Sequence, residues 1–166
     1  MDISNENLIE YIVGDILCRN KLTISTAESC TGGMVAAKLI SYPGISSSFL
    51  EGAVTYSNEA KMKRLGVNKR TLDNYGAVSE ETAIEMAEGI AKESSSKVSI
   101  STTGIAGPGG GTDKKPVGLV YIAVHVNKVT KVEKCNFTGC REEVRISATN
   151  YALKMLKDEL EKQNYK

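Results

Sequence analysis

The chain has a single histidine, no tryptophan and only two phenylalanines among its 166 residues. A Ser-His-Asp or Cys-His hydrolase would have to use that histidine, His125, which lies inside an apolar run typical of a strand. An isolated histidine on a strand is more often a core residue than a catalytic one, so we expect His125 to be structural. A hydrolase with this sequence therefore needs another group as its general base.

Cysteines and long apolar runs are also scarce. The four cysteines, Cys18, Cys30, Cys135 and Cys140, form no CxxC pair, and one histidine does not complete the usual zinc ligand sets. The longest apolar run, 117–124, is only as long as a strand, which is too short to cross a membrane. The first residues lack the basic and apolar regions of a signal peptide. We therefore expect a cytoplasmic protein with reduced thiols and with neither metal nor cofactor.

No excess of either charge is present, because 21 basic residues nearly balance 20 acidic ones and the net charge is +1. This balance provides no chain-wide field for binding nucleic acid or an anionic membrane, so we expect neither as a partner. Apolar residues make up 41% and charged residues 25%, which is typical of a globular protein. The length and composition predict one domain over residues 1–166 with a sizeable core.

Hydrophobic periodicity and turn signals predict alternating helices and strands. Helices are expected over 5–19, from Thr31-Gly32-Gly33 to about Ile40, over 58–65, from Ser79 onward and over 141–162. Strands are expected over 22–27, 49–56 and 98–103, and 117–126 and 130–137 form a hairpin that turns near Asn127-Lys128. This order predicts an α/β fold, a three-layer α/β/α sandwich around a mixed, mostly parallel sheet. The amphipathic first and last helices favour a homodimer or a higher homo-oligomer.

Three segments place polar residues and glycines where a predicted strand ends. They are 27–33 (AESCTGG), 55–61 (TYSNEAK) and 102–108 (TTGIAGP). Ligands of open α/β sheets bind at the carboxyl ends of the strands, beside helix N-termini. If the three strands are parallel, the three segments meet in one crevice.

Ser29 and Cys30 are the candidate nucleophiles of the first segment. Ser29 stands just before the helix predicted to begin near Thr31, where unpaired N–H groups favour an oxyanion or a phosphate. The alternative interpretation is that Ser29 or Thr31 simply caps this helix. Cys30 has no histidine to activate it, and free cysteines are usually buried and inert.

Lys61 is the candidate general base of the second segment. It falls in the first turn of its helix, where the helix dipole and partial burial both favour the neutral amine that a Ser/Lys hydrolase uses as base. Tyr56 is placed to relay or orient the proton. The alternative is that Lys61 is one of many solvated lysines and Tyr56 a core residue.

The third segment opens a glycine-rich loop, 104–111, followed by the basic pair Lys114-Lys115. The loop matches neither the P-loop nor the dinucleotide-binding pattern, but its glycines allow backbone N–H groups to approach an anion closely. The alternatives are a flexible surface turn and a solvated basic pair.

Together these segments resemble the CinA C-terminal domain family, whose stand-alone members are nicotinamide mononucleotide amidohydrolases of the PncC type. The matching runs are 27–33, 54–61, 76–81 (GAVSEE), 103–108, 115–118 (KPVG), and Gly139 with Arg141 and Arg145. Their order and spacing agree from about residue 5 to residue 160.

The resemblance implies Ser29 as nucleophile, Lys61 as general base and Tyr56 as an assisting residue. It implies a nucleotide site lined by Thr31, Gly32, Thr103, Gly104, Ala106 and Gly107, with Arg141 and Arg145 on the substrate phosphate. The family commonly has an aspartate before the first of these arginines, where Cys140 stands here.

The activity implied by the resemblance is hydrolysis of the carboxamide of nicotinamide mononucleotide to nicotinate mononucleotide and ammonia, in pyridine nucleotide salvage. The alternative is a catalytically silent nucleotide-binding or regulatory module linked to competence or the DNA-damage response. Direct binding to DNA is a third interpretation, and the net charge of +1 opposes it.

Overall fold

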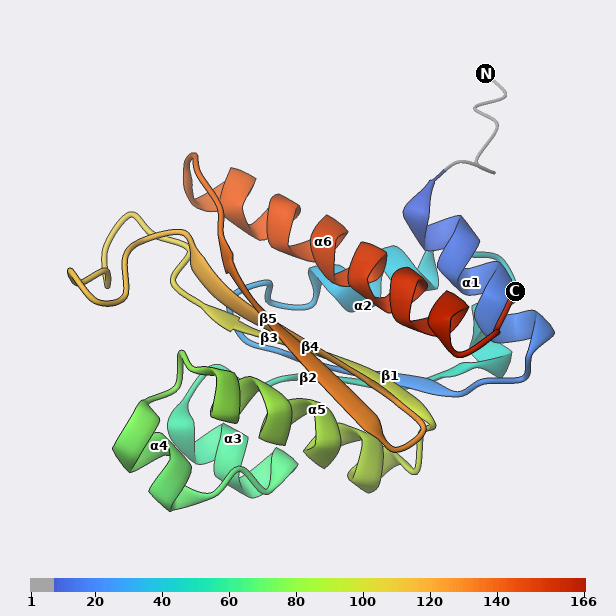
Figure 1. Ribbon diagram of the computed structural model, residues 1–166, viewed down its shortest axis with the longest axis horizontal. Coiled ribbons are helices and arrows are strands. Elements are labelled where there is room, and N and C mark those ends of the chain that lie inside the picture. The colour runs from blue at the N-terminus through green and yellow to red at the C-terminus, as the bar shows by residue number, and fades with distance from the viewer. Residues whose placement is uncertain (1–7) are drawn as a thin grey trace.

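The computed structural model describes residues 8–166 and is built on one five-stranded sheet in the order β2-β1-β3-β4-β5 (Figure 1). The strands are β1 (Ile24–Glu28), β2 (Phe49–Val54), β3 (Val98–Gly104), β4 (Leu119–Val126) and β5 (Val129–Asn136). β1 pairs in parallel with both β2 and β3, whereas β4 is antiparallel to both β3 and β5. Only β4 therefore opposes the common direction, and the predicted mixed, mostly parallel sheet is confirmed.

Helices cover both faces of the sheet, which confirms the three-layer prediction (Figure 1). One face carries α1 (Ile9–Arg19), α2 (Met34–Ile40) and α6 (Arg141–Lys162), and the other carries α3 (Asn58–Leu65), α4 (Lys69–Tyr75) and α5 (Glu80–Ser94). A short 3-10 helix, η2 (Ile45–Ser47), precedes β2. The apolar sides of α1 and α6 meet each other in the larger core cluster, where Leu17 and Leu153 are fully buried.

Local signals set most helix and strand ends. The Ser57 hydroxyl accepts the Ala60 N–H at the start of α3, and the Ser79 hydroxyl accepts the Thr82 N–H at the start of α5. Asn127 is left-handed, with φ 58°, in the tight turn between β4 and β5. The predictions for α3, the start of α5, the hairpin and α6 are confirmed.

The predicted start of the second helix is wrong. α2 begins at Met34 rather than near Thr31, because Gly32 and Gly33 have φ values of 61° and 96°. A right-handed helix does not accommodate these angles, so the chain makes a turn there first. The first helix, expected over 5–19, is observed as Ile9–Arg19, and residues 5–7 lie outside the described part of the chain.

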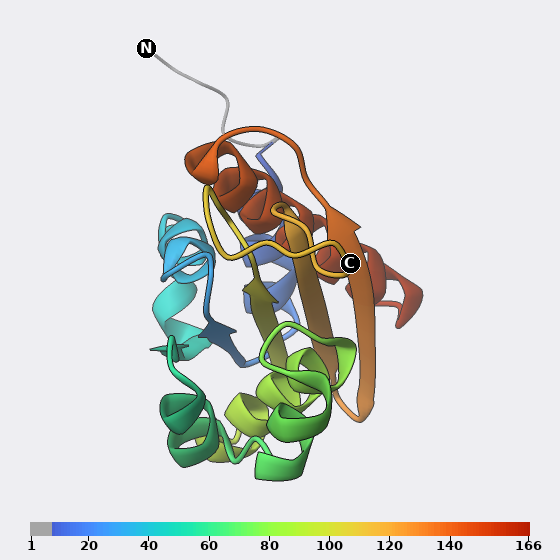
Figure 2. The ribbon, with the colours of Figure 1, turned by 90° about the vertical axis from the view of Figure 1, so that its left-hand side faces the viewer.

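The carboxyl ends of β1, β2 and β3 meet at one end of the molecule. This end faces the viewer in Figure 2, where the loop 105–118 and the start of α6 lie beside it. Parallel pairing therefore brings the three polar segments together, as predicted. Within residues 8–166, every helix is too short or too polar to cross a bilayer.

Candidate active site

Ser29 and Lys61 are in contact at this end of the sheet. Ser29 directly follows β1, and its backbone N–H donates to the Thr102 carbonyl of β3 at 2.9 Å. Lys61 extends from α3, and its Nζ lies 3.2 Å from Ser29 Oγ and 2.7 Å from the Thr55 carbonyl oxygen. The fold thus assembles a hydroxyl–amine pair from residues that follow two neighbouring strands.

The Lys61 amine is deeply buried, with only 1% of the residue exposed, so the interpretation as a solvated lysine is wrong. Burial lowers the pKa of Lys61 because it disfavours the charged ammonium, and the nearby Cys30 opposes this shift more weakly. Among the described residues, its hydrogen bonds go only to a hydroxyl and a carbonyl, and it forms no ion pair with a carboxylate. These surroundings favour a neutral amine that is able to accept a proton.

The buried carboxylate of Glu28 organises the turn that carries Ser29. Its hydrogen-bond donors are the Thr31 hydroxyl (2.6 Å) and the backbone N–H groups of Gly33 (3.0 Å), Val35 (3.1 Å) and Ala36 (2.9 Å). Glu28 therefore caps α2, and the expectation that Ser29 or Thr31 does so is wrong. The N–H groups of this helix start are also occupied, so they do not form the anion site that the sequence suggested there.

Sequence reasoning assigned no role to Glu28, although the residue lies within the first matching segment. Its signal was an acidic side chain at the end of a buried strand, directly before a turn with two glycines. An acidic residue in that position is able to reach the N-terminus of the helix that follows the turn.

Arg145 holds the same turn from the side of α6. Its Nε donates to the Cys30 carbonyl at 3.1 Å and its Nη2 to the Thr31 carbonyl at 3.0 Å. The Thr31 hydroxyl also lies 2.7 Å from the Thr102 hydroxyl of β3. A Cβ on Gly32 would come within 3.3 Å of Arg145 Nη2, and the φ angle of Gly32 is positive. Both features favour glycine at this position.

Arg141 connects two other predicted site residues. Its Nη1 donates to the Gly107 carbonyl at 2.8 Å and its Nη2 to the Tyr56 hydroxyl at 3.0 Å. Tyr56 is 62% exposed, so it is not a core residue. Its hydroxyl is bound to Arg141 rather than to Ser29 or Lys61.

The remaining predicted residues of the glycine loop have mainly structural contacts. The Thr103 hydroxyl donates to the Ala77 carbonyl at 2.6 Å, and Ala106 is buried in the larger core cluster. A side chain on Gly104 would come within 2.6 Å of the Leu119 carbonyl oxygen. Thr103, Gly104 and Ala106 are therefore placed to contribute backbone groups rather than side chains.

Two groups considered as alternatives lie in unreactive settings. Burial raises the pKa of the Cys30 thiol to about 11, so the thiolate that would act as nucleophile is scarce near neutral pH. His125 Nδ1 lies 2.8 Å from the Thr130 hydroxyl, and His125 pairs with Ser99 in the first half of β3, away from the strand end that holds Ser29.

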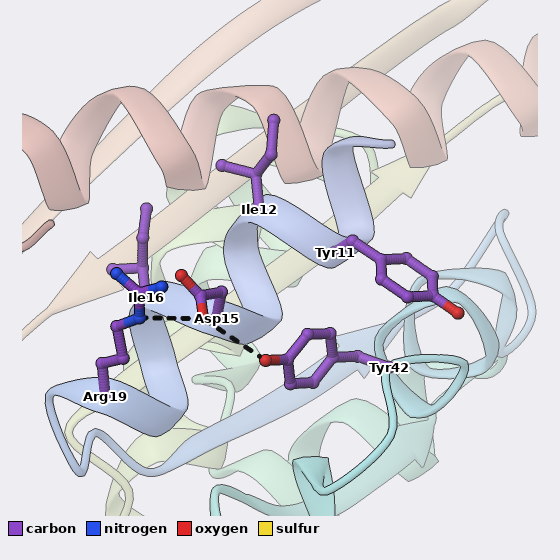
Figure 3. A pocket seen from close by; sticks show the side chains of 6 residues that line it. All are labelled: Tyr11, Ile12, Asp15, Ile16, Arg19 and Tyr42. Carbon is purple, nitrogen blue, oxygen red and sulfur yellow. Dashed lines mark hydrogen bonds and ion pairs between the residues drawn. The ribbon is translucent and has the colours of Figure 1, made fainter. Parts of the chain in front are cut away.

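A separate cavity of about 410 Å³ lies along α1 (Figure 3). Its polar groups bind one another, since the Asp15 carboxylate accepts from Arg19 Nε at 3.0 Å and from the Tyr42 hydroxyl at 3.4 Å. Arg19 ends α1 just before β1 begins, so this cavity lies toward the opposite end of the sheet from Ser29.

The sequence of this chain is similar to those of known proteins over nearly its whole length. A family model described as the CinA C-terminal domain matches residues 6–160. A competence-damage inducible protein of Clostridium perfringens is 61% identical over 157 residues, which cover 95% of this chain and 38% of the relative. A protein of the same name from Clostridium beijerinckii is 64% identical over 149 residues, which cover 90% of this chain and 36% of that relative. The chain thus spans well under half the length of these relatives.

Solved structures share the fold along most of both chains. The competence/damage inducible protein CihA of Agrobacterium tumefaciens has a TM-score of 0.85 at 41% identity, covering 89% of this chain and 93% of that one. A CinA superfamily protein of Klebsiella pneumoniae has a TM-score of 0.88 at 35% identity, and the match covers 92% of this chain and 95% of that one. The chain belongs to the CinA C-terminal domain family.

Proposed function

We propose that the chain is a serine amidohydrolase that converts nicotinamide mononucleotide to nicotinate mononucleotide and ammonia. The observation that supports this most directly is the 3.2 Å contact between the buried Lys61 amine and the Ser29 hydroxyl. An amine with a lowered pKa next to a serine hydroxyl is the arrangement that replaces histidine in Ser/Lys hydrolases. The resemblance to the amidohydrolases of this family supplies the substrate.

In the proposed reaction, neutral Lys61 accepts the Ser29 proton while Oγ attacks the carboxamide carbon. Because the N–H groups around Ser29 and at the start of α2 are already bonded, backbone N–H groups of the loop that begins at Gly104 stabilise the oxyanion of the tetrahedral intermediate, an effect commonly worth about 3 kcal/mol per donor. Protonated Lys61 then gives its proton to the departing ammonia, and Tyr56 assists from the exposed side of the site. Water attacks the acyl-enzyme, and its proton passes to Lys61, which restores Ser29.

The arginines of α6 provide positive charge for the substrate phosphate. Arg141 is exposed and bound to Tyr56, and Arg145 is half-buried beside the turn that carries Ser29. A guanidinium has several donors in one plane, so it is able to keep a protein contact and still bind phosphate oxygens.

Ammonia release from nicotinamide mononucleotide by the purified chain tests the proposal, with Ser29→Ala measured alongside. We expect wild type to release ammonia and Ser29→Ala to release none while it unfolds at a similar temperature. Activity in Ser29→Ala would contradict the assignment of the nucleophile.

The second candidate is a catalytically silent nucleotide-binding or regulatory module linked to competence or the DNA-damage response, and the names of the relatives, which refer to competence and damage, agree with that link. Calorimetric binding of nicotinamide mononucleotide without ammonia release would support it. The first variant to examine would then be Cys140→Asp, because Cys140 occupies the N-cap of α6 where the family commonly has aspartate.

A further inference from the structure

The turn after β1 is fixed from two sides by opposite charges. The Glu28 carboxylate accepts four hydrogen bonds from this turn and the first residues of α2. The Arg145 guanidinium donates to the carbonyls of Cys30 and Thr31 within the turn. The directions of the peptide groups that follow Ser29 are thus set by side chains rather than by a regular helix.

We propose that Glu28 is a positioning residue for catalysis, which holds Ser29 Oγ in line with Lys61 Nζ by fixing the turn between β1 and α2. This inference rests on the proposed role of Ser29 as nucleophile. Glu28 is adjacent to Ser29 in the chain and is 1% exposed, so its own position is set by the packing around β1. It acts on the reaction only through the turn.

A carboxylate is well suited to this position because all four of the groups that hydrogen-bond to it are donors. An amide at position 28 would keep one acceptor oxygen and would turn an N–H group toward backbone N–H groups, leaving buried donors unpaired. The turn contains Gly32 and Gly33, both left-handed, so it has little stiffness of its own. Without the carboxylate we therefore expect the turn to shift and to carry Ser29 away from Lys61.

The role we assign is geometric, and it has its own kinetic signature. Desolvation is the main cause of the Lys61 pKa shift and Cys30 opposes it, whereas Glu28 raises the pKa of Cys30 and is not itself a cause of the Lys61 shift. Replacing Glu28 should therefore lower the maximal rate strongly and move the pH at which activity rises only slightly. A merely electrostatic role would move that pH.

The test compares Glu28→Gln with Glu85→Gln. Glu85 does the equivalent structural task on the other face of the molecule, where its carboxylate accepts the Asn68 N–H at 2.7 Å and the Thr71 hydroxyl at 2.6 Å at the start of α4. Both variants lose a helix-capping carboxylate, but only Glu28 borders Ser29. Two readouts are measured below the unfolding temperature of each variant: steady-state ammonia release, and labelling of Ser29 by a fluorophosphonate probe followed by mass spectrometry.

We expect Glu28→Gln to lower kcat and the labelling rate by about 100-fold, the loss that a misplacement of about 1 Å is able to cause. KM should stay unchanged and the pH midpoint should move little, and Glu85→Gln should behave as wild type in both readouts. Wild-type labelling and turnover in Glu28→Gln, or an equal loss in Glu85→Gln, would overturn the inference.

Two further outcomes separate this inference from the proposed function. If wild type labels at Ser29 but releases no ammonia, the substrate assignment fails and the labelling rates alone decide the role of Glu28. If wild-type Ser29 neither labels nor supports turnover, both proposals fail. Should Glu28→Gln not fold, Glu28→Asp replaces it, since aspartate keeps the charge but has a shorter reach; wild-type labelling in Glu28→Asp would overturn the inference.

Discussion

Lys61 Nζ lies 3.2 Å from Ser29 Oγ, although 32 positions separate the two residues in the chain. The register of the sheet sets this contact, because Glu28, just before Ser29, pairs with Val54 at the end of β2. Ser57 then caps α3, and the Lys61 side chain extends from the first turn of this helix to Ser29. The pair is therefore a property of the tertiary fold.

The pH dependence of turnover should report the protonation of Lys61. Its pKa is lowered by burial, so we expect activity to rise with pH through a midpoint below the ordinary lysine value, as the neutral amine forms. Lys61→Ala should lose the activity, and with it the rise of activity with pH. Full activity in Lys61→Arg would show that the base is another group, because arginine stays protonated.

The same shift should appear in stability. Between the lowered pKa of folded Lys61 and the ordinary value of 10.5, the unfolded chain binds one more proton than the folded chain. The free energy of unfolding of wild type should therefore rise with pH in this window relative to that of Lys61→Met, which has no such proton. Urea unfolding of both proteins at a series of alkaline pH values checks this, and parallel pH curves would contradict it.

Arg141→Met should weaken the use of a phosphorylated substrate selectively. A hydrogen bond to a charged group contributes about 1.5–3 kcal/mol, so we expect kcat/KM for nicotinamide mononucleotide to fall by about 10–100-fold. Hydrolysis of nicotinamide riboside, which lacks the phosphate, is the matched control and should be little affected. An equal loss for both substrates would assign Arg141 to the chemical step or to the Tyr56 contact instead.

Gly89→Ala should destabilise the layer that carries Lys61. A Cβ at Gly89 in α5 would lie 1.9 Å from the carbonyl oxygen of Leu65, the last residue of α3, so the two helices must move apart. Such overpacking usually costs about 1–3 kcal/mol of the free energy of unfolding. Thermal unfolding measures this, with the loop substitution Gly109→Ala as control, because nothing lies within 4 Å of a Cβ there. Equal unfolding temperatures for the two variants would contradict the prediction.

The sequence predicted best the elements whose ends carry local signals. The bounds of α3 and α6 agree with the structure, as does the turn at Asn127. In contrast, α4 (Lys69–Tyr75) was not predicted, because its seven residues include only one buried aliphatic side chain, Leu72. Its signals were the cap residues Asn68 and Gly76, which flank it.

The site was predictable in its residues but not in its contacts. Periodicity placed Ser29 and Lys61 near helix starts, and the family resemblance paired them. The capping of α2 by Glu28 and the bonds from Arg145 to two backbone carbonyls depend on the path of the turn at Gly32 and Gly33. Such tertiary contacts leave no periodic pattern in the sequence.

The packing of α1 against α6 has a consequence for how the chain folds as it is synthesised. Residues 20–140 lie between the two helices, so the side of α1 that packs on α6 stays uncovered until α6 has been made. Contacts of such long range form slowly, and the exposed surface is prone to aggregation in the meantime. During synthesis this side of α1 should therefore stay exposed until α6 has left the ribosome.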